Sequence, residues 1–466
     1  MNPGELELSR EEMRQLGHQV VDLLVEHFAT LRDQPIGRKA DRSSLMAALD
    51  EPPPRWGTPP TVLLQRLERE VFPNCLRVSH PRFFAFVPSP SNYVSAMADA
   101  LASGFNVFAG TWMGGSAAAA MELVVTGWLR DLCGLAETAE GLLVSGGSMA
   151  NLTGLAVARH TRLPRGAAGA TVYMSDQTHS SVERALYVIG FLPEQLRKLA
   201  AGGDGRLETM ALGKVVAEDR AAGFTPFCVI ANAGTTNTGA VDPLDELAEL
   251  CRQEGLWLHV DGAYGAAAAI CPRGREILRG LDLADSVSLD PHKWLFQPFE
   301  CGCAFVRQPG LLKETFRIMP EYLEDVHRGV EEVHFCDRGV QLTRGFRSLK
   351  LWLTFQVFGA DAIRAAVERG FTLAEYAESR LREMPGWEIE TPARMAVVTF
   401  LHKALDNQRH HMLVDRLLED GHAFLTSTTL NGRTVLRMCT INPRTKESDV
   451  DSTLARLARY ASDLQL

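Results

Sequence analysis

The sequence predicts an α/β protein built on a mostly parallel β-sheet. From about residue 140, short β-rich apolar runs alternate with helical stretches, which is typical of parallel strands joined by crossover helices. The composition, 46% apolar and 23% charged over 466 residues, is that of a globular chain and excludes a disordered or coiled-coil protein. The net charge of −9 offers no basic surface for nucleic acid.

The N-terminal region is predicted to be helical. Ser9 and Glu12 form a capping-box pattern, and apolar residues then recur at helical spacing as far as Phe28. This apolar face has no obvious partner nearby in the sequence, so it would need another domain or subunit. Proline-rich residues 50–60 indicate an extended linker. Helical spacing returns at 61–75 and at 94–135, where a glycine-rich break covers 110–115.

The predicted strands lie in the runs GLLVSGG, TVYMSDQTH, FCVIANAGTT, LWLHVDGAY, DSVSLDPHKW and CGCAFVRQ. The charged block at about 310–345 is weakly periodic and is expected to be a mobile loop. Two long helices are predicted after it. From about residue 387 strands and helices alternate again, which indicates a smaller α/β domain.

Several classes of protein are excluded by simple patterns. The nine cysteines show no CxxC spacing, so neither a zinc site nor a disulfide framework is indicated, and reduced thiols in a cytoplasmic protein are expected. The N-terminus is too acidic for a signal or transit peptide. No apolar run approaches the roughly 20 residues of a membrane helix.

Polar residues follow the predicted strands at the point where each strand ends. Ligands of open parallel sheets lie beyond the carboxyl ends of the strands, so these residues would converge if their strands are neighbours. They are Gly146, Gly147 and Ser148 after the first run, His179, Thr235 and Thr236, Asp261, and Asp290 to Lys293.

Each of these residues alone has a plainer interpretation. Ser148 could cap a helix, His179 could be a satisfied polar residue, Asp261 could cap a loop, and Lys293 could be solvated. Together they fit pyridoxal 5'-phosphate (PLP). A helix N-terminus suits its phosphate, an Asp suits its protonated ring nitrogen, and a desolvated Lys suits a Schiff base. Only eight of the 48 cationic residues are lysines, so few amines could serve.

The chain resembles the group II PLP-dependent amino acid decarboxylases, in particular the aromatic-L-amino-acid decarboxylases, over roughly residues 5–465. The spacing of HVDGAYG and DPHKW, from Asp261 to Lys293, is very specific. The motifs that carry the resemblance are HPRFFAFVPSPSNY (80–93), SGGSMANLTGL (145–155), SDQTHSSVERA (175–185), NAGTTNTGAVD (232–242), HVDGAYG (259–265), DPHKW (290–294), FRIMPEYL (316–323) and GFRSLKLW (345–352).

The resemblance implies an aspartate-aminotransferase-like fold (fold type I). It also implies an N-terminal helical dimerisation segment at 1–80, a large PLP-binding domain at 81–360 and a small C-terminal α/β domain at 361–466. The family forms an intertwined homodimer, which would cover the apolar face of the first helix. Phe105 and Phe108 would then reach the pocket of the other subunit.

The resemblance also implies roles for single residues. Lys293 resembles the lysine that forms the Schiff base, Asp261 the partner of the ring nitrogen, and His179 the histidine stacked on the ring. The residues that resemble further cofactor contacts are Gly147, Ser148, the backbone of Met149, Thr236, Ser89, Asp290 and His292. Tyr322 resembles the loop tyrosine that returns a proton to the substrate carbon, and it is usually replaced in related aldehyde synthases.

The expected activity is therefore decarboxylation of an L-amino acid, with an aromatic substrate favoured. The family's Trp and Tyr-Phe positions correspond here to Val78, Phe86 and Val87, and Gly262 replaces a usual alanine. Arg82 leaves an acidic substrate open, unless it is a surface charge. An aldehyde synthase, aminotransferase or carbon–carbon lyase on the same fold stays an alternative, and a non-enzymatic PLP-binding relative is disfavoured by the retained catalytic set.

Overall fold

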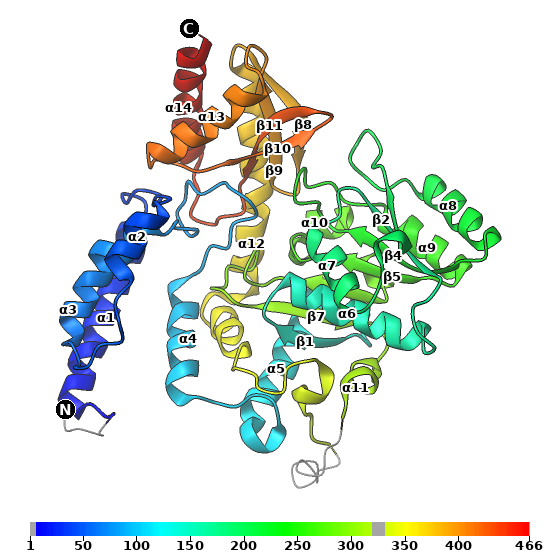
Figure 1. Ribbon diagram of the computed structural model, residues 1–466, viewed down its shortest axis with the longest axis horizontal. Helices are drawn as coiled ribbons and strands as arrows, with labels where there is room; N and C mark the ends of the chain where they lie inside the picture. Colours follow the sequence, from blue (N-terminus) through cyan, green and yellow to red (C-terminus); the bar gives the residue numbers. More distant parts are fainter. Residues whose placement is uncertain (1–5, 319–330, 466) are drawn as a thin grey trace.

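The protein, described here from a computed structural model over residues 6–318 and 331–465, is organised around two β-sheets (Figure 1). The larger sheet has seven strands in the order β1-β7-β6-β5-β4-β2-β3. Its strands are β1 (Glu140–Val144), β2 (Ala170–Ser175), β3 (Leu196–Leu199), β4 (Thr225–Asn232), β5 (Trp257–Asp261), β6 (Ser286–Leu289) and β7 (Gly302–Val306).

Strands β2 to β6 pair in parallel, and β7 runs antiparallel to both of its neighbours. The predicted mostly parallel sheet is thus confirmed. Strand β3 was not expected, because its four residues, Leu-Arg-Lys-Leu, are half charged and lie at the sheet edge.

Helices cover both faces of this sheet. One face packs against α5 (Trp112–Leu132), α8 (Thr209–Ala221) and α9 (Leu244–Glu254). The other packs against α6 (Gly147–Arg162), α7 (Ser180–Val188) and α11 (Leu311–Phe316). Because central strands are buried on both sides, they read as continuous apolar runs, and polar groups are confined to their ends.

The smaller sheet is antiparallel and comprises β8 (Trp387–Arg394), β9 (Val397–His402), β10 (Thr426–Leu430) and β11 (Arg433–Cys439), in the order β10-β11-β9-β8. Helices α13 (Asn407–Glu419) and α14 (Glu447–Gln465) pack with it around a separate apolar core. Helix α12 (Ser348–Glu383) joins the two sheets and merges the two predicted helices at a break, where Gly359 has a φ of +77°.

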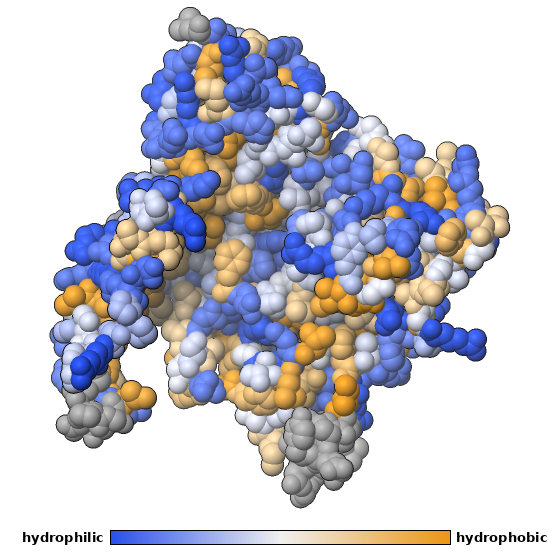
Figure 2. Space-filling model, in the orientation of Figure 1, coloured by the Kyte–Doolittle hydropathy of each residue, from blue (hydrophilic) through white to orange (hydrophobic). Residues whose placement is uncertain are grey.

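The N-terminal helices α1 (Arg10–Thr30), α2 (Arg42–Leu49) and α3 (Pro60–Arg66) form an arm that stands apart from the sheets (Figure 1). The predicted capping box is confirmed: Ser9 Oγ accepts from Glu12 N at 3.3 Å, and Glu12 Oε2 accepts from Ser9 N at 2.8 Å. An apolar groove runs along the arm, lined by Val20, Leu23, Leu24, Leu64, Leu67 and Phe72 among others. Figure 2 shows the surface hollowed between this arm and the body.

The expectation of a loop over 310–345 is wrong at its edges. Residues Leu311–Phe316 form α11, and Phe335–Arg338 form a 3-10 turn packed in the interior. The apolar positions Leu311 and Leu312 bury against α6, which outweighs the surrounding charge. Tyr322 lies outside the described residues. No helix within 6–318 and 331–465 has the length and apolar character needed to cross a membrane.

Candidate active site

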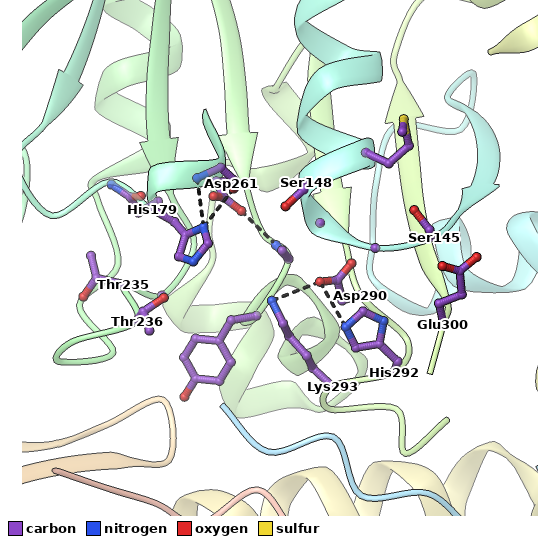
Figure 3. A pocket seen from close by; sticks show the side chains of 18 residues that line it. Ser145, Ser148, His179, Thr235, Thr236, Asp261, Asp290, His292, Lys293 and Glu300 are labelled. Atoms are coloured by element: carbon purple, nitrogen blue, oxygen red, sulfur yellow. Dashed lines mark hydrogen bonds and ion pairs between the residues drawn. The ribbon is translucent and has the colours of Figure 1, made fainter. Parts of the chain in front are cut away.

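The polar residues predicted to converge line one cavity of about 350 Å³ at the carboxyl ends of the parallel strands (Figure 3). The predicted convergence of these polar residues is confirmed, because residues that follow several strands of the large sheet line the same cavity. The lining residues are Ser145, Gly146, Gly147, Ser148, Met149, His179, Ser181, Asn232, Gly234, Thr235, Thr236, Asp261, Ala263, Tyr264, Asp290, His292, Lys293 and Glu300.

The turn between β1 and α6 is shaped by glycines. Gly146 precedes α6 without any side-chain cap, so the first N–H groups of a long helix face the cavity. A Cβ on Gly147 would lie 2.7 Å from Ala263 Cβ and 2.8 Å from Asp290 Oδ2. A Cβ on Gly302 would lie 2.5 Å from Gly146 Cα. Only glycines allow these close approaches, and the resulting cradle suits a phosphate.

Lys293 lies opposite this turn and is paired with a buried carboxylate. Its Nζ is 2.9 Å from Asp290 Oδ2, and His292 Nε2 is 3.5 Å from the same oxygen. Asp290 Oδ1 is buried without a hydrogen-bond partner. Burial lowers the pKa of His292, so its ring is neutral near pH 7. Lys293 is thus the one cation among the described lining residues, and the Asp290 carboxylate holds its amine in place.

Asp261 ends strand β5 at the centre of the sheet and is 8% exposed. Its Oδ1 accepts from Ser288 Oγ at 3.1 Å and from Ala263 N at 3.2 Å, and its Oδ2 accepts from Asn151 Nδ2 at 3.2 Å. These neutral donors compensate the burial of the carboxylate while it still lines the cavity.

His179 caps the N-terminus of α7 with its own ring. Its Nδ1 accepts from Ser181 N at 3.2 Å and lies 2.8 Å from Ser181 Oγ, while the ring borders the cavity (Figure 3). In the cavity lining, Tyr264 stacks on the buried Trp294 with ring centroids 5.5 Å apart. Burial raises the pKa of Tyr264 well above its usual range, so this wall is neutral.

Eleven predicted residues line the cavity: Gly146, Gly147, Ser148, Met149, His179, Thr235, Thr236, Asp261, Asp290, His292 and Lys293. Ser89, Phe86, Val87, Phe105 and Phe108 do not line it within one chain. Phe105 is 79% exposed at the end of α4 (Tyr93–Phe105). Phe86 is 56% exposed and contacts Phe424 edge-on at 6.0 Å.

Neither interpretation of Arg82 is correct. Its guanidinium is mostly buried away from the cavity, where it lies 3.4 Å from Asp449 of α14 and donates to the carbonyl oxygen of His422 at 2.7 Å. It therefore ties the segment 80–93 to the C-terminal helices and is neither a free surface charge nor a group that could bind a substrate.

Sequence reasoning missed seven lining residues, Ser145, Ser181, Asn232, Gly234, Ala263, Tyr264 and Glu300, and Asn151 behind the lining. Tyr264 and Ser181 stand inside the motifs HVDGAYG and SDQTHSSVERA, so their position three residues after Asp261 and two after His179 was an available signal. Glu300 has no such signal, since it lies in a loop before β7.

The residues of this cavity fit PLP. The glycine cradle and the start of α6 suit its phosphate, Asp261 suits its ring nitrogen, and Lys293 supplies an amine. Fold and site together define a PLP-dependent enzyme of the fold type I class. The chain belongs to the pyridoxal-dependent decarboxylase family, whose conserved domain matches residues 43–403.

Relatives match the chain over nearly its whole length. The aromatic-L-amino-acid decarboxylase of Bacillus atrophaeus is 46% identical, over 99% of this chain and 98% of that protein. The phenylacetaldehyde synthase of Arabidopsis thaliana is 30% identical, over 98% of this chain and 97% of that protein. The crystal structure of Oryza sativa TDC with PLP and tryptamine has a TM-score of 0.93 and 29% identity, and covers 99% of this chain and 100% of that chain. The protein is therefore a PLP-dependent carboxy-lyase.

We predict that Gly147→Ala lowers PLP affinity by more than tenfold, because its methyl group would collide with Ala263 and Asp290 at the cradle. Fluorescence titration of the apoprotein with PLP measures this. Gly213→Ala in α8 is the control, since its Cβ would make only an ordinary 3.7 Å contact with Leu250. If the folded Gly147→Ala variant binds PLP as tightly as the wild type, the cradle is not the phosphate site.

Proposed function

We propose that the protein converts an aromatic L-amino acid to its amine and CO₂, with Lys293, Asp261, His179 and Tyr322 as the catalytic residues. The observation that carries this proposal is the convergence of the Lys293–Asp290 pair, the buried Asp261 and the glycine cradle in one cavity. The 46% identity with an aromatic-L-amino-acid decarboxylase along the whole chain supports the substrate class.

When bound, PLP supplies a conjugated ring that accepts the electron pair of the breaking Cα–carboxylate bond. The N–H groups of Gly147 and Ser148 at the start of α6 would bind the phosphate, next to Met149, whose own N–H donates to the carbonyl oxygen of Gly146 at 2.9 Å. The Asp261 carboxylate holds a proton at the ring nitrogen, because it is an anion fixed by donors on its far side. His179 covers the ring face and excludes water. Thr236 and His292 would complete the cofactor contacts within the cavity, and Ser89, which is buried outside its lining, is proposed as a contact on the resemblance alone.

Lys293 supplies the amine that would hold the cofactor. The 2.9 Å contact with Asp290 Oδ2 supports a positioning role for that carboxylate, which fixes the amine near the cradle. Asp290 Oδ2 also lies at the cradle, where a Cβ on Gly147 would come within 2.8 Å of it, so we propose that this carboxylate reaches the phosphate end of the cofactor while the Lys293 amine balances its charge.

The charges of the cavity favour an uncharged substrate side chain. Lys293 is the only Lys or Arg among the described lining residues, and Asp290 already pairs with it. Glu300 adds a further carboxylate to the rim. Because Arg82 is engaged with Asp449, an acidic side chain would meet carboxylates without a cationic partner in this lining. Phe86 and Val87 do not line this cavity, since Phe86 contacts Phe424 beside the smaller sheet, and we propose them as pocket residues for the substrate side chain outside the cofactor lining.

A panel of purified L-amino acids tests the proposed function. We expect amine and CO₂ in equal amounts from tyrosine, tryptophan or phenylalanine, and neither from glutamate or aspartate. Lys293→Ala should abolish turnover and the visible absorbance of lysine-bound PLP, because no other described side chain in the cavity is an amine. Lys214→Ala, on the exposed face of α8, is the matched control and should behave as wild type. Turnover of acidic substrates alone would overturn the aromatic assignment.

An aldehyde synthase is the second candidate, because a phenylacetaldehyde synthase matches the whole chain at 30% identity. Such an enzyme consumes O₂ and water and releases aldehyde, CO₂, ammonia and hydrogen peroxide. We propose that Tyr322 prevents this by returning a proton to the substrate carbon. Tyr322→Phe should then produce aldehyde and peroxide at the expense of amine, with PLP binding unchanged. If amine yield is unaffected, Tyr322 has no part in the reaction.

We further propose that the protein is a homodimer in the cytoplasm, with 1–80 as dimerisation segment, 81–360 as PLP-binding domain and 361–466 as small domain. The apolar groove along α1 and α3 and the 79% exposed Phe105 support a second copy as the occupant. Phe105 and Phe108 would then enter the partner's pocket. The nine free cysteines support a reducing compartment.

Light scattering should give twice the mass of one chain. Phe105→Ser should raise KM for the aromatic substrate several-fold without changing that mass, since it would remove an apolar wall of the partner's pocket. Leu192→Ser, at a 56% exposed site between α7 and β3, controls for the loss of a surface apolar group. A monomer with full activity would exclude the shared site.

A further inference from the structure

Behind the cavity, a chain of hydrogen bonds links Trp257 and His259 of β5 to His179. Trp257 Nε1 donates to Ser286 Oγ at 2.9 Å, and that hydroxyl lies 2.8 Å from His259 Nδ1. His259 Nε2 is 3.0 Å from Asn151 Oδ1. Asn151 Nδ2 reaches Ser181 Oγ at 3.1 Å and Asp261 Oδ2 at 3.2 Å, and Ser181 Oγ reaches His179 Nδ1 at 2.8 Å.

Every link between the two ends is shielded from water. Asn151 and His259 are 0% exposed, Ser286 is 1% and Ser181 is 4%. Helix α6 can approach the imidazole this closely because residue 154 is a glycine: a Cβ there would lie 3.0 Å from both Cε1 and Nδ1 of His259. With no solvent to substitute for a missing partner, each donor in the chain must face an acceptor.

The Asp261 end sets the direction of these hydrogen bonds. An ionised carboxylate only accepts, so the Asn151 carboxamide must turn its NH₂ group toward Asp261 Oδ2. Its oxygen then faces His259, which must carry a proton on Nε2. Burial lowers the pKa of His259 to about 4, so the ring is neutral near pH 7 and its Nδ1 is an acceptor.

The Trp257 end of the chain requires the same direction of hydrogen bonding. An indole N–H can only donate, so Ser286 Oγ accepts from Trp257 and turns its own hydrogen toward His259 Nδ1. At the cavity, the backbone N–H of Ser181 donates to His179 Nδ1 at 3.2 Å, which makes that nitrogen an acceptor. Ser181 Oγ, which accepts from Asn151, is free to donate to the same nitrogen.

We infer that Asn151 and His259 are positioning residues, which hold the Asp261 carboxylate and Ser181 in one fixed arrangement and leave His179 with its proton on Nε2 only. His179 therefore presents a hydrogen-bond donor to the cavity. The Asn151 side chain couples Asp261 and Ser181, because its one NH₂ group donates to both of them. Both roles assume the function proposed above, in which Asp261 and His179 face PLP.

The tautomers can be measured in the wild-type holoenzyme. Long-range ¹H–¹⁵N correlation spectra of protein labelled at its histidine rings report which nitrogen carries the proton, and His179→Gln and His259→Gln identify the two signals by their loss. We expect protonated Nε2 and bare Nδ1 for both residues at neutral pH. A proton on Nδ1 of either residue would overturn the inferred direction.

The positioning role is tested by His259→Leu against His259→Gln. Leucine fills similar space without a donor, whereas the glutamine amide can replace the N–H that faces Asn151. We expect His259→Leu to weaken PLP binding about tenfold and to reduce the visible absorbance of lysine-bound PLP, and His259→Gln to restore both. If the two folded variants bind PLP equally well, His259 does not act through this hydrogen bond.

Two further variants keep the test decisive. Ser286→Ala removes the donor to His259 Nδ1, so it should shift the ¹⁵N resonance of that nitrogen while Nε2 keeps its proton, a test that stands even if His259→Leu fails to fold. Ser288→Ala removes a donor to Asp261 Oδ1 outside the chain, so it should leave both tautomers unchanged. If the wild-type enzyme binds PLP but forms no amine, the proposed function is refuted and these results still stand. If it forms amine but His259→Leu and His259→Gln bind PLP equally well, only the positioning role is refuted.

Discussion

The burial of the Asp261 carboxylate at the centre of the large sheet is the constraint on which much of the site depends. An ion taken out of water must receive hydrogen bonds from the protein. Three elements supply them: the turn after β5 through Ala263 N, β6 through Ser288, and α6 through Asn151. The spacing of β5, β6 and α6 is therefore coupled to a single charge, and α6 in turn carries the glycine cradle.

This arrangement requires very close packing. Gly154 lets α6 approach His259, and Gly147 leaves no room for a methyl group beside Ala263. A buried ion pair, Arg344 with Glu122, holds the β1 edge of the large sheet. Arg344 Nη2 lies 2.6 Å from both Glu122 Oε1 and the carbonyl oxygen of Leu143, which joins α5 and β1 to the segment before α12. Such pairs add little net stability, but leaving either partner alone is costly, so they favour one arrangement of the elements.

Much of this fold could be predicted because parallel strands buried on both faces produce apolar runs with polar ends. That rule located His179, Asp261 and Lys293 without knowledge of the packing. It could not find Asn151, which lies on the covered face of a helix, or the partnership of His259 with it, since a buried histidine inside LWLHV looks like any satisfied polar residue. These contacts join residues 108 positions apart, and only the tertiary fold brings them together.

Other features depended on contacts that sequence spacing does not encode. The sequence leaves Arg82 as either a group that binds an acidic substrate or a surface charge, but Asp449, 367 residues later, pairs with it. Phe105 and Phe108 do not line the cavity of their own chain, so their role depends on a second copy. The division at 80 and 360 stays a prediction, although Gly359 interrupts α12 next to the second boundary.

The cavity holds two buried carboxylates whose surroundings give them different chemical capacities. Asp261 receives only neutral donors, from a hydroxyl, an amide and a backbone N–H, so its negative charge is oriented but not cancelled by a cation. Asp290 instead pairs with the Lys293 ammonium, which balances its charge. A cationic group entering the cavity would therefore be attracted to Asp261, while Asp290 keeps the amine in place. The difference arises from the partners of each carboxylate, because both are almost fully buried at the ends of neighbouring strands.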